Sequence, residues 1–194
     1  MNFALWIKAF RLRTLPLALS SAILGSFLAY AEGGIRWQVL VLATLTTLFL
    51  QILSNLANDY GDAMHGTDNH RRIGPLRVTQ SGLVSKGSMR IMIGVFVLLA
   101  LVSGVLLIFT GLHHIGWKTI LVFFLLGVSA IYAAISYTVG KNPYGYIGLG
   151  DLFVFIYFGI VGVAGTYYLH TNHFDPWVLL PASAIGLLSS GVLN

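Results

Sequence analysis

Carboxylate and amide side chains gather in one short stretch of this 194-residue chain. The chain has only six acidic residues, and three of them, Asp59, Asp62 and Asp68, lie within ten positions of one another. If a helix continues to about residue 62, Asn55, Asp59 and Asp62 stand at positions i, i+4 and i+7 and share one helix face. Asn58 and Asp62 form a second i, i+4 pair beside them.

Oxygen atoms on one helix face suit a hard cation. Mg²⁺ prefers oxygen ligands, takes one or two carboxylates and completes its shell with water and substrate phosphates. We therefore interpret Asn55, Asp59, Asp62 and Asp68 as candidate metal ligands, with Asp59 and Asp62 catalytic and Asn58 in contact with a bound diphosphate. The alternative is a solvated helix end, in which Asn and Asp serve as cap and turn residues.

Basic side chains follow the acidic stretch directly. Arg71, Arg72, Arg77 and Lys86 could bind the remaining negative charge of a metal-bound diphosphate, because arginine forks bind phosphate oxygens in pairs. We take Arg77 as the candidate diphosphate ligand of this group and the nearby Gln80 as a candidate acceptor contact. For Arg71 and Arg72 an ordinary role in membrane topology is at least as good an explanation.

Four more positions could belong to the same site. Lys141 could pair with phosphate, and the ring of Tyr137 could face a developing cation, so both are candidate catalytic residues. Asp151 begins a later helix, where a carboxylate also suits the helix dipole, and is a further candidate on the acceptor side. Arg13 either reaches the diphosphate or anchors the first helix.

Aromatic and histidine side chains near these positions have simpler explanations. Tyr144 and Tyr146 fit an aromatic belt at the membrane interface, with Lys141 snorkelling to the surface beside them. His65 is expected to be a solvated loop residue.

The elements that must position these residues are membrane helices. The chain is 57% hydrophobic and 9% charged, whereas soluble domains carry about 25% charged residues. A spanning helix needs about 20 apolar residues. The sequence predicts an all-α membrane protein with about six such helices, near 14–31, 37–57, 91–112, 118–138, 151–169 and 177–193. There is no cysteine, which excludes disulfides and thiolate metal sites.

Charge fixes the expected orientation. With six alternating spans, nine of the eleven Lys and Arg residues fall on one side and only Arg36 and Lys118 on the other. The positive-inside rule makes the richer side, with the N-terminus and the acidic stretch, cytoplasmic. Removing one span would scramble this division. Nothing in the sequence resembles an aromatic-interleaved basic surface for nucleic acid, so we expect the lipid bilayer and no nucleic acid among the partners.

The acidic stretch resembles the first aspartate-rich motif of the UbiA-type intramembrane prenyltransferase superfamily. That motif has the form N-D-x-x-D, here Asn58, Asp59 and Asp62, often with an Asn four residues before the first Asp, here Asn55. Its common form has an Asp where this chain has Gly66, and here the acid is Asp68. This variant looks like the branch acting on 1,4-dihydroxy-2-naphthoate. Other segments similar to that branch are Arg13-Thr14-Leu15-Pro16, Gly74-Pro75, Gln80-Ser81-Gly82, Tyr144-Gly145-Tyr146-x-Gly148-x-Gly150-Asp151 and Gly165-Thr166-Tyr167-Tyr168.

The resemblance implies a reaction and its partners. It implies Mg²⁺-dependent transfer of a polyprenyl group from polyprenyl diphosphate to 1,4-dihydroxy-2-naphthoate, with loss of CO₂ and formation of demethylmenaquinone in a bacterial cell or inner membrane. It also implies a bundle of about nine helices with a second aspartate-rich motif after the sixth. Because the sequence ends at Asn194, we expect residues 1–194 to be a single transmembrane prenyltransferase domain, incomplete at its C-terminus. The oligomeric state is left open.

Two rival functions are compatible with the sequence. One is prenylation of another acceptor, such as 4-hydroxybenzoate, homogentisate or haem. The other is a small cation-coupled transporter that uses the acidic stretch as its cation site. A transporter commonly has ionisable residues near the middle of several spans, whereas the charges here cluster at one membrane face, which favours an interfacial enzyme site.

Overall fold

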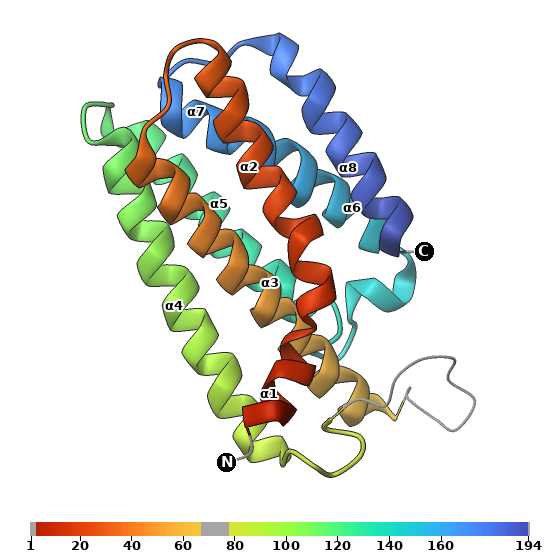
Figure 1. Cartoon of the computed structure of the whole chain (residues 1–194). Helices are drawn as coiled ribbons and strands as arrows, with labels where there is room; N and C mark the ends of the chain where they lie inside the picture. The colour runs from red at the N-terminus through yellow and green to blue at the C-terminus, as the bar shows by residue number, and fades with distance from the viewer. Residues whose placement is uncertain (1–2, 67–77, 194) are drawn as a thin grey trace.

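The computed structural model describes residues 3–66 and 78–193, and within these ranges every regular element is a helix. The helices form an elongated bundle and run back and forth along its length (Figure 1). The expected all-α class is therefore confirmed. In chain order the elements are α1 Phe3–Phe10, η1 Leu12–Thr14, α2 Leu15–Ala31, α3 Trp37–His65, α4 Lys86–Leu112, α5 Trp117–Ser136, η2 Tyr144–Ile147, α6 Gly150–Val154, η3 Phe155–Gly165, α7 Thr166–Thr171, η4 Pro176–Val178 and α8 Leu179–Leu193.

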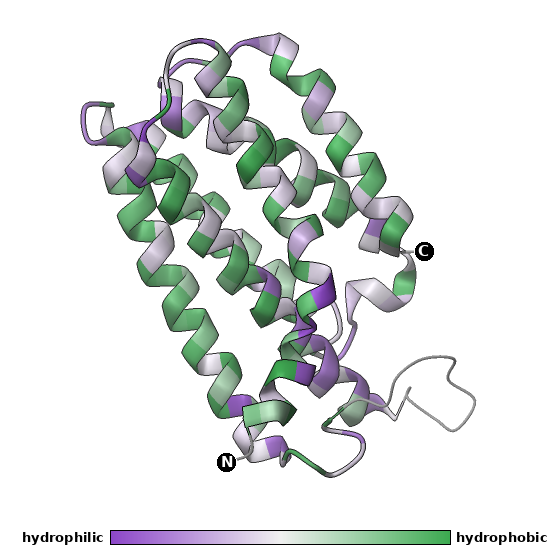
Figure 2. Ribbon diagram, in the orientation of Figure 1, coloured by the Kyte–Doolittle hydropathy of each residue, from purple (hydrophilic) through white to green (hydrophobic). Residues whose placement is uncertain are grey.

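Six of the helical segments are apolar, as predicted. Five are long and apolar enough to cross a membrane, namely Phe3–Ala31, Trp37–His65, Lys86–Leu112, Trp117–Ser136 and Gly150–Thr171, and the sixth, Pro176–Val192, is shorter. Figure 2 shows hydrophobic residues along the lengths of the helices and hydrophilic residues concentrated toward their ends. Length and composition therefore make this an integral membrane protein.

Two boundaries differ from the sequence prediction. The second predicted span ended near residue 57, but α3 continues to His65, because its polar last turns are buried against neighbouring segments. The short helix α1 was not predicted. It forms because Trp6 and Ala9 on one of its sides are buried in the core.

The chain changes direction between α1 and α2. Arg11 adopts a left-handed backbone conformation with φ 51°, which ends α1. The single turn η1 follows, and Pro16 lies in the first turn of α2, where its fixed φ favours the helix and its missing N–H has no cost. The break leaves α1 in contact with α3.

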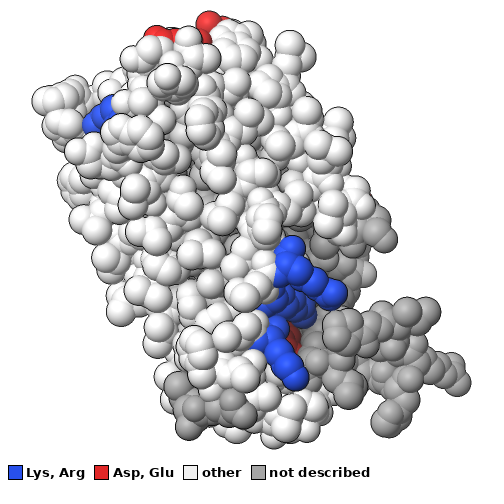
Figure 3. Space-filling view, in the orientation of Figure 1, with Lys and Arg blue, Asp and Glu red and all other residues white. Residues whose placement is uncertain are grey.

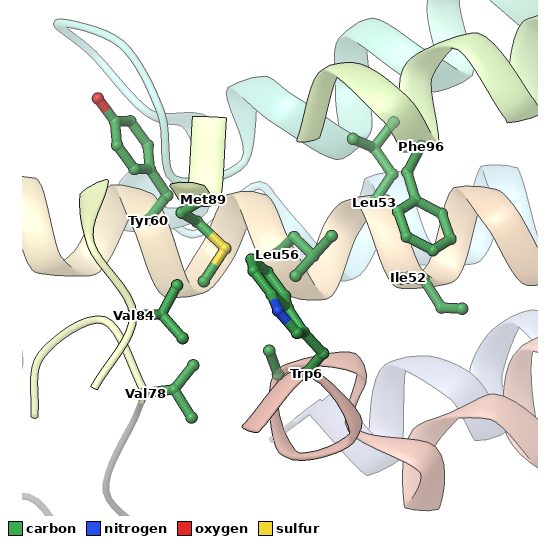
Figure 4. Packing of buried hydrophobic residues seen from close by; sticks show 10 residues of the cluster. Trp6, Ile52, Leu53, Leu56, Tyr60, Val78, Val84, Met89 and Phe96 are labelled. Atoms are coloured by element: carbon green, nitrogen blue, oxygen red, sulfur yellow. The ribbon is translucent and has the colours of Figure 1, made fainter. Parts of the chain in front are cut away.

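The core next to α1 positions the last turns of α3. Ile52, Leu53, Leu56 and Tyr60 share one side of α3, since successive residues turn by about 100°. They pack with Trp6, Val78, Val84, Met89 and Phe96, which come from α1, the segment before α4, and α4 itself (Figure 4). Asn55, Asp59 and Asp62 follow beside this apolar side around α3, so its packing in the core fixes the direction in which they face.

Basic residues lie mostly at the end of the bundle that holds α1 and the end of α3. Among the described residues these are Lys8, Arg11, Arg13, Lys86, Arg90 and Lys141. Arg36, just before α3, and Lys118, in the first turn of α5, lie at the opposite end. Figure 3 shows Lys and Arg gathered beside an acidic group near the α1 end, and acidic residues at the other extremity. The division expected from the sequence thus holds for the described part of the chain.

Hydrogen bonds close the opposite end of the bundle. The carboxylate of Glu32, which follows α2, accepts hydrogen bonds from the Tyr167 hydroxyl and, at 3.2 Å, from Trp177 Nε1. The Arg36 guanidinium donates to the carbonyl oxygens of Gly111 at 3.0 Å and Leu169 at 3.3 Å. These bonds tie α2, α4, α7 and η4 together.

Candidate active site at the mouth of a cavity

The three residues expected to share a helix face do so. Because α3 is continuous to His65, Asn55, Asp59 and Asp62 lie along one side of its last turns. All three are buried, with exposed fractions of 3%, 2% and 6%. Burial of two carboxylates is costly unless cations or hydrogen-bond donors compensate for it, so a solvated helix end does not describe this segment.

The end of α3 is held by the segment that follows α5. The Thr138 hydroxyl lies 3.1 Å from both the Ala57 carbonyl oxygen and Asn58 Oδ1. A Cβ on Gly61 would lie 2.5 Å from the Thr138 carbonyl oxygen. Only glycine therefore permits this close approach, and it stands between the two aspartates for a packing reason.

Asn55 connects α3 to the turn between α1 and α2. Its Nδ2 donates hydrogen bonds to the Phe10 carbonyl oxygen at 2.9 Å and to Thr14 Oγ1 at 3.0 Å. Its Oδ1 accepts from Gln51 Nε2 at 3.3 Å. The structure thus gives Asn55 a positioning role, and its suggested role as a metal ligand stays a prediction.

Asp62 has an aromatic neighbour that sequence reasoning assigned elsewhere. The Tyr146 hydroxyl donates a hydrogen bond to Asp62 Oδ1, and the Tyr146 ring lies edge-on to the His65 ring at 5.5 Å. The two ring nitrogens of His65 lie 2.9 Å from the Gly61 carbonyl oxygen and 3.1 Å from that of Gly140. Tyr146 and His65 are therefore part of the site. These contacts were not predicted, because no local pattern shows contacts made across some 80 residues of sequence. Both side chains are exposed, so the interfacial position of Tyr146 and the solvation of His65 stay predictions, although His65 ends α3 rather than lying in a loop.

Tyr137 and Tyr144 belong to an aromatic group at the same end. Their rings meet edge to face at 5.3 Å, and the Tyr144 ring stacks on Phe153 at 4.1 Å. The Tyr144 hydroxyl donates to the Ala133 carbonyl oxygen at 2.8 Å. Burial raises the pKa of Tyr144 above its ordinary value, so this phenol stays protonated and keeps donating that bond.

None of the four remaining predicted residues within the described ranges lines the cavity described below. Lys141, Gln80 and Asp151 are exposed, and so is Arg13. Arg11, which sequence reasoning did not single out, lines the cavity described below, because its left-handed backbone turns the chain there. Roles for these side chains in binding remain predictions. Asp68 and Arg77 lie outside the described residues.

A cavity of about 370 Å³ opens beside the acidic end of α3. Its wall combines apolar residues with a polar strip from α3 and an aromatic group from the C-terminal half of the chain. The aromatic residues of the wall are Phe123, Tyr137, Tyr144, Phe153, Tyr157 and Phe158. A ligand with an apolar chain and an aromatic ring would find suitable surfaces here.

The donor set fits a divalent cation that shares its shell with a ligand. Among the described residues, no three His, Cys, Asp or Glu side chains form a cluster able to hold a metal by themselves. Asp59 and Asp62 supply two carboxylates, which is the number that Mg²⁺ commonly takes from a protein when substrate phosphates supply further oxygens. Hard cations of this kind fit these residues.

The comparison with protein families decides the classification. The family model of the UbiA prenyltransferase family matches residues 18–194 of the chain. The chain belongs to the UbiA prenyltransferase family. Enzymes of this UbiA family are generally dependent on a divalent metal, which agrees with the carboxylates at the end of α3.

Curated UbiA-family relatives resemble the chain over nearly its whole length. The 1,4-dihydroxy-2-naphthoate octaprenyltransferase of Haemophilus influenzae is 47% identical over 98% of this chain and 62% of that protein. The protein of the same name from Escherichia coli is 45% identical over 97% of the chain and 61% of that protein. The protein of the same name from Mycobacterium leprae is 37% identical over 99% of this chain and 62% of that protein. The chain therefore spans about three-fifths of the length of these relatives. No solved structure matches it.

Proposed function

We propose that the protein transfers a polyprenyl group from a polyprenyl diphosphate to 1,4-dihydroxy-2-naphthoate. The observation that carries the proposal is the pair Asp59 and Asp62, buried at the end of α3 directly after Asn55 and Asn58, which line an aromatic-walled cavity. Family membership supports prenyl transfer, and the names of the relatives that are 37–47% identical support this acceptor.

Asp59 and Asp62 would hold Mg²⁺ together with oxygens of the donor diphosphate. When bound, the ion supplies electrostatic stabilisation of the departing diphosphate. Tyr146 orients the Asp62 carboxylate through its hydrogen bond. Thr138 and Gly61 keep the last turns of α3 packed against the segment after α5. Basic residues at this end of the bundle, such as Arg11 and Lys141, would bind remaining negative charge.

The cavity would hold the organic parts of both substrates. Its apolar wall suits the polyprenyl chain, and the faces of Tyr137, Tyr144 and Phe153 would stabilise positive charge that develops on the allylic carbon. Exclusion of water protects that carbon from hydrolysis. These features assign shielding and orientation, rather than proton transfer, to the aromatic group.

The proposed prenyl transfer requires no oxidant. The carbon–oxygen bond between the prenyl group and diphosphate breaks, and the electron pair leaves with diphosphate. A ring carbon of the acceptor supplies the pair for the new carbon–carbon bond. The attacked ring carbon releases its proton, which restores the aromatic ring. The carboxylate departs as CO₂, and its bonding pair stays on the ring carbon that it leaves, which takes up a proton. The immediate product is the quinol form of demethylmenaquinone.

We further propose that the acidic end of α3 faces the cytoplasm. The support is the positive-inside rule, applied to the six described basic residues at that end against Arg36 and Lys118 at the other. A water-soluble acceptor and a diphosphate product would then enter and leave on the cytoplasmic side.

An assay of prenyl transfer in membranes tests the function. Membranes that contain the full-length protein should convert octaprenyl diphosphate and 1,4-dihydroxy-2-naphthoate into a prenylated, decarboxylated quinol, detected by mass spectrometry. A chelator should abolish turnover and excess Mg²⁺ should restore it. We expect Asp59→Asn to lower turnover at least 100-fold, since one oxyanion-stabilising contact alone is worth about 10²–10³ in kcat.

The matched control is Asp175→Asn at the opposite end of the bundle. Asp175 accepts a hydrogen bond from the Trp177 backbone N–H at 3.2 Å, and asparagine can keep that bond. Its activity should equal that of the unmodified protein. Full turnover by well-folded Asp59→Asn would refute the proposed site, and preferred turnover of 4-hydroxybenzoate or homogentisate would refute the proposed acceptor.

A further inference from the structure

Helix α3 presents a second polar strip that the carboxylate site does not use. Thr47, Gln51, Ser54 and Asn58 follow one another at positions i, i+4, i+7 and i+11 and all line the cavity. This strip lies beside the face that carries Asp59, on the side of α3 away from the core residues Ile52 and Leu56. Polar side chains at this depth of a membrane helix are costly unless something binds them.

The hydroxyls of Thr47 and Ser54 do not bond to carbonyl oxygens of their own helix. Many hydroxyls in the membrane helices do; for example, Thr44 Oγ1 donates to the Leu40 carbonyl oxygen at 2.7 Å and Ser26 Oγ to that of Ala22 at 2.8 Å. Within the described part of the chain, Thr47 and Ser54 make no side-chain hydrogen bond. These two hydroxyls point to a ligand because local carbonyl oxygens, the usual partners, are not used.

The side-chain carbonyl oxygen of Gln51, which lies between Thr47 and Ser54 on α3, can accept a hydrogen bond from a ligand. Its Nε2 donates to Thr14 Oγ1 and Asn55 Oδ1, both at 3.3 Å. These bonds hold the side chain in place and leave Oε1 with no partner among the described residues. The strip therefore offers one acceptor flanked by two hydroxyls, held in fixed positions by a single helix.

Two further hydroxyls support a polar ligand in this cavity. Ser21 of α2 and Ser189 of α8 line it, each has an exposed fraction of 2%, and neither finds a hydrogen-bond partner among the described residues. Arg11 is the one charged residue in the described lining. Neutral hydrogen-bonding groups beside aromatic rings suit the hydroxyl groups of an aromatic ring. A polyprenyl tail has nothing to bond to them, and a diphosphate would require cations.

We propose that the strip formed by Thr47, Gln51 and Ser54 is the subsite that binds the ring hydroxyl groups of the aromatic acceptor. This assignment rests on the proposed function. With a rise of about 1.5 Å per residue, Ser54 lies about 7.5 Å and Thr47 about 18 Å along α3 from Asp59. An acceptor bound here lies directly inside the carboxylates, where a ring carbon can reach the prenyl carbon that leaves the diphosphate.

Steady-state kinetics of Ser54→Ala and Thr47→Val test the subsite. With full-length purified protein and saturating octaprenyl diphosphate, each change should raise KM for 1,4-dihydroxy-2-naphthoate about 5- to 10-fold, as expected for one lost hydrogen bond. The KM for octaprenyl diphosphate should stay unchanged and kcat should stay within about twofold. Equilibrium binding of the acceptor, measured without donor, should weaken by the same factor.

A matched control and a substrate analogue separate recognition from a structural effect. Thr44→Val removes a hydroxyl of the same helix that bonds only to Leu40, and should leave both KM values unchanged. The acceptor analogue 1-hydroxy-2-naphthoate lacks one ring hydroxyl. With this analogue, at least one of Ser54→Ala and Thr47→Val should no longer raise the acceptor KM above that of the unmodified protein. Any of three results would overturn the subsite. The acceptor KM could be unchanged in both variants, it could rise equally with both acceptors, or the KM for octaprenyl diphosphate could rise. Absence of turnover by the unmodified protein would instead refute the proposed function.

Discussion

Gly61 shows how a single residue can determine the geometry of the acidic motif. The residue makes no chemical contribution, yet it lies between Asp59 and Asp62 and against the backbone of Thr138. A side chain there would push the last turn of α3 away from Thr138, which hydrogen-bonds to Ala57 and Asn58. The positions of the two carboxylates therefore depend on the absence of a Cβ atom at position 61.

Gly61→Ala should lower both stability and activity. The new Cβ would lie 2.5 Å from the Thr138 carbonyl oxygen, and such overpacking costs about 1–3 kcal/mol. We expect a lower thermal midpoint in detergent and a loss of turnover of about tenfold. Gly94→Ala is the matched control, since a Cβ there meets nothing within 4 Å and alanine favours the helix by up to about 1 kcal/mol. Equal behaviour of the two variants would contradict this explanation of Gly61.

Elements are joined at the site by side chains rather than by extended backbone contacts. Thr14 is the clearest case, because its hydroxyl accepts hydrogen bonds from Asn55 and Gln51 of α3 and donates one to the Arg11 carbonyl oxygen at 2.9 Å. These hydrogen bonds hold the turn between α1 and α2 against the polar side of α3. Arg11 is directed to the cavity mouth by the same turn.

Thr14→Val should loosen this junction. Valine keeps the shape but leaves one amide N–H of Asn55 and one of Gln51 without an acceptor, since their other N–H groups still donate to Phe10 and Asn55. A buried donor left unpaired costs about 1–3 kcal/mol. We expect a lower thermal midpoint and a higher KM for the prenyl diphosphate, because both Arg11 and Asn55 lose their fixed positions. Thr44→Val, which loses only a bond within its own helix, serves as the control. A wild-type midpoint for Thr14→Val would show that the junction is held by apolar packing alone.

At the scale of the whole molecule, charge is separated between the two ends of the bundle. The basic end holds α1, the end of α3 and the segment after α5, while Glu32 and Asp175 lie at the other end. In a membrane this separation orients the protein, since basic segments stay on the cytoplasmic side. The site and the orientation therefore depend on the same distribution of residues.

Single cysteines can report the orientation directly, since the 194 residues contain none. Ser81→Cys lies at the basic end and His114→Cys at the opposite end, and both positions are exposed. In intact spheroplasts a membrane-impermeant maleimide should label the cysteine at position 114 and spare the one at 81 until the membrane is opened. The reverse pattern would invert the proposed topology.

Short-range patterns in the sequence determined the class of protein and the carboxylate face. Helical periodicity places Asn55, Asp59 and Asp62 together without any tertiary contact, and apolar length alone defines the membrane segments. The charge partition follows from the order of those segments. These features depend on neighbours within a few turns, which is why they could be predicted.

Tertiary structure alone decided which other side chains join that face. Tyr146 reaches Asp62, and Thr138 reaches Asn58, across separations of 84 and 80 residues. Arg11, rather than Arg13, lines the cavity because of one left-handed residue. Such contacts depend on how whole helices pack, and a backbone reversal or a missing Cβ has its effect only when a distant segment lies against it.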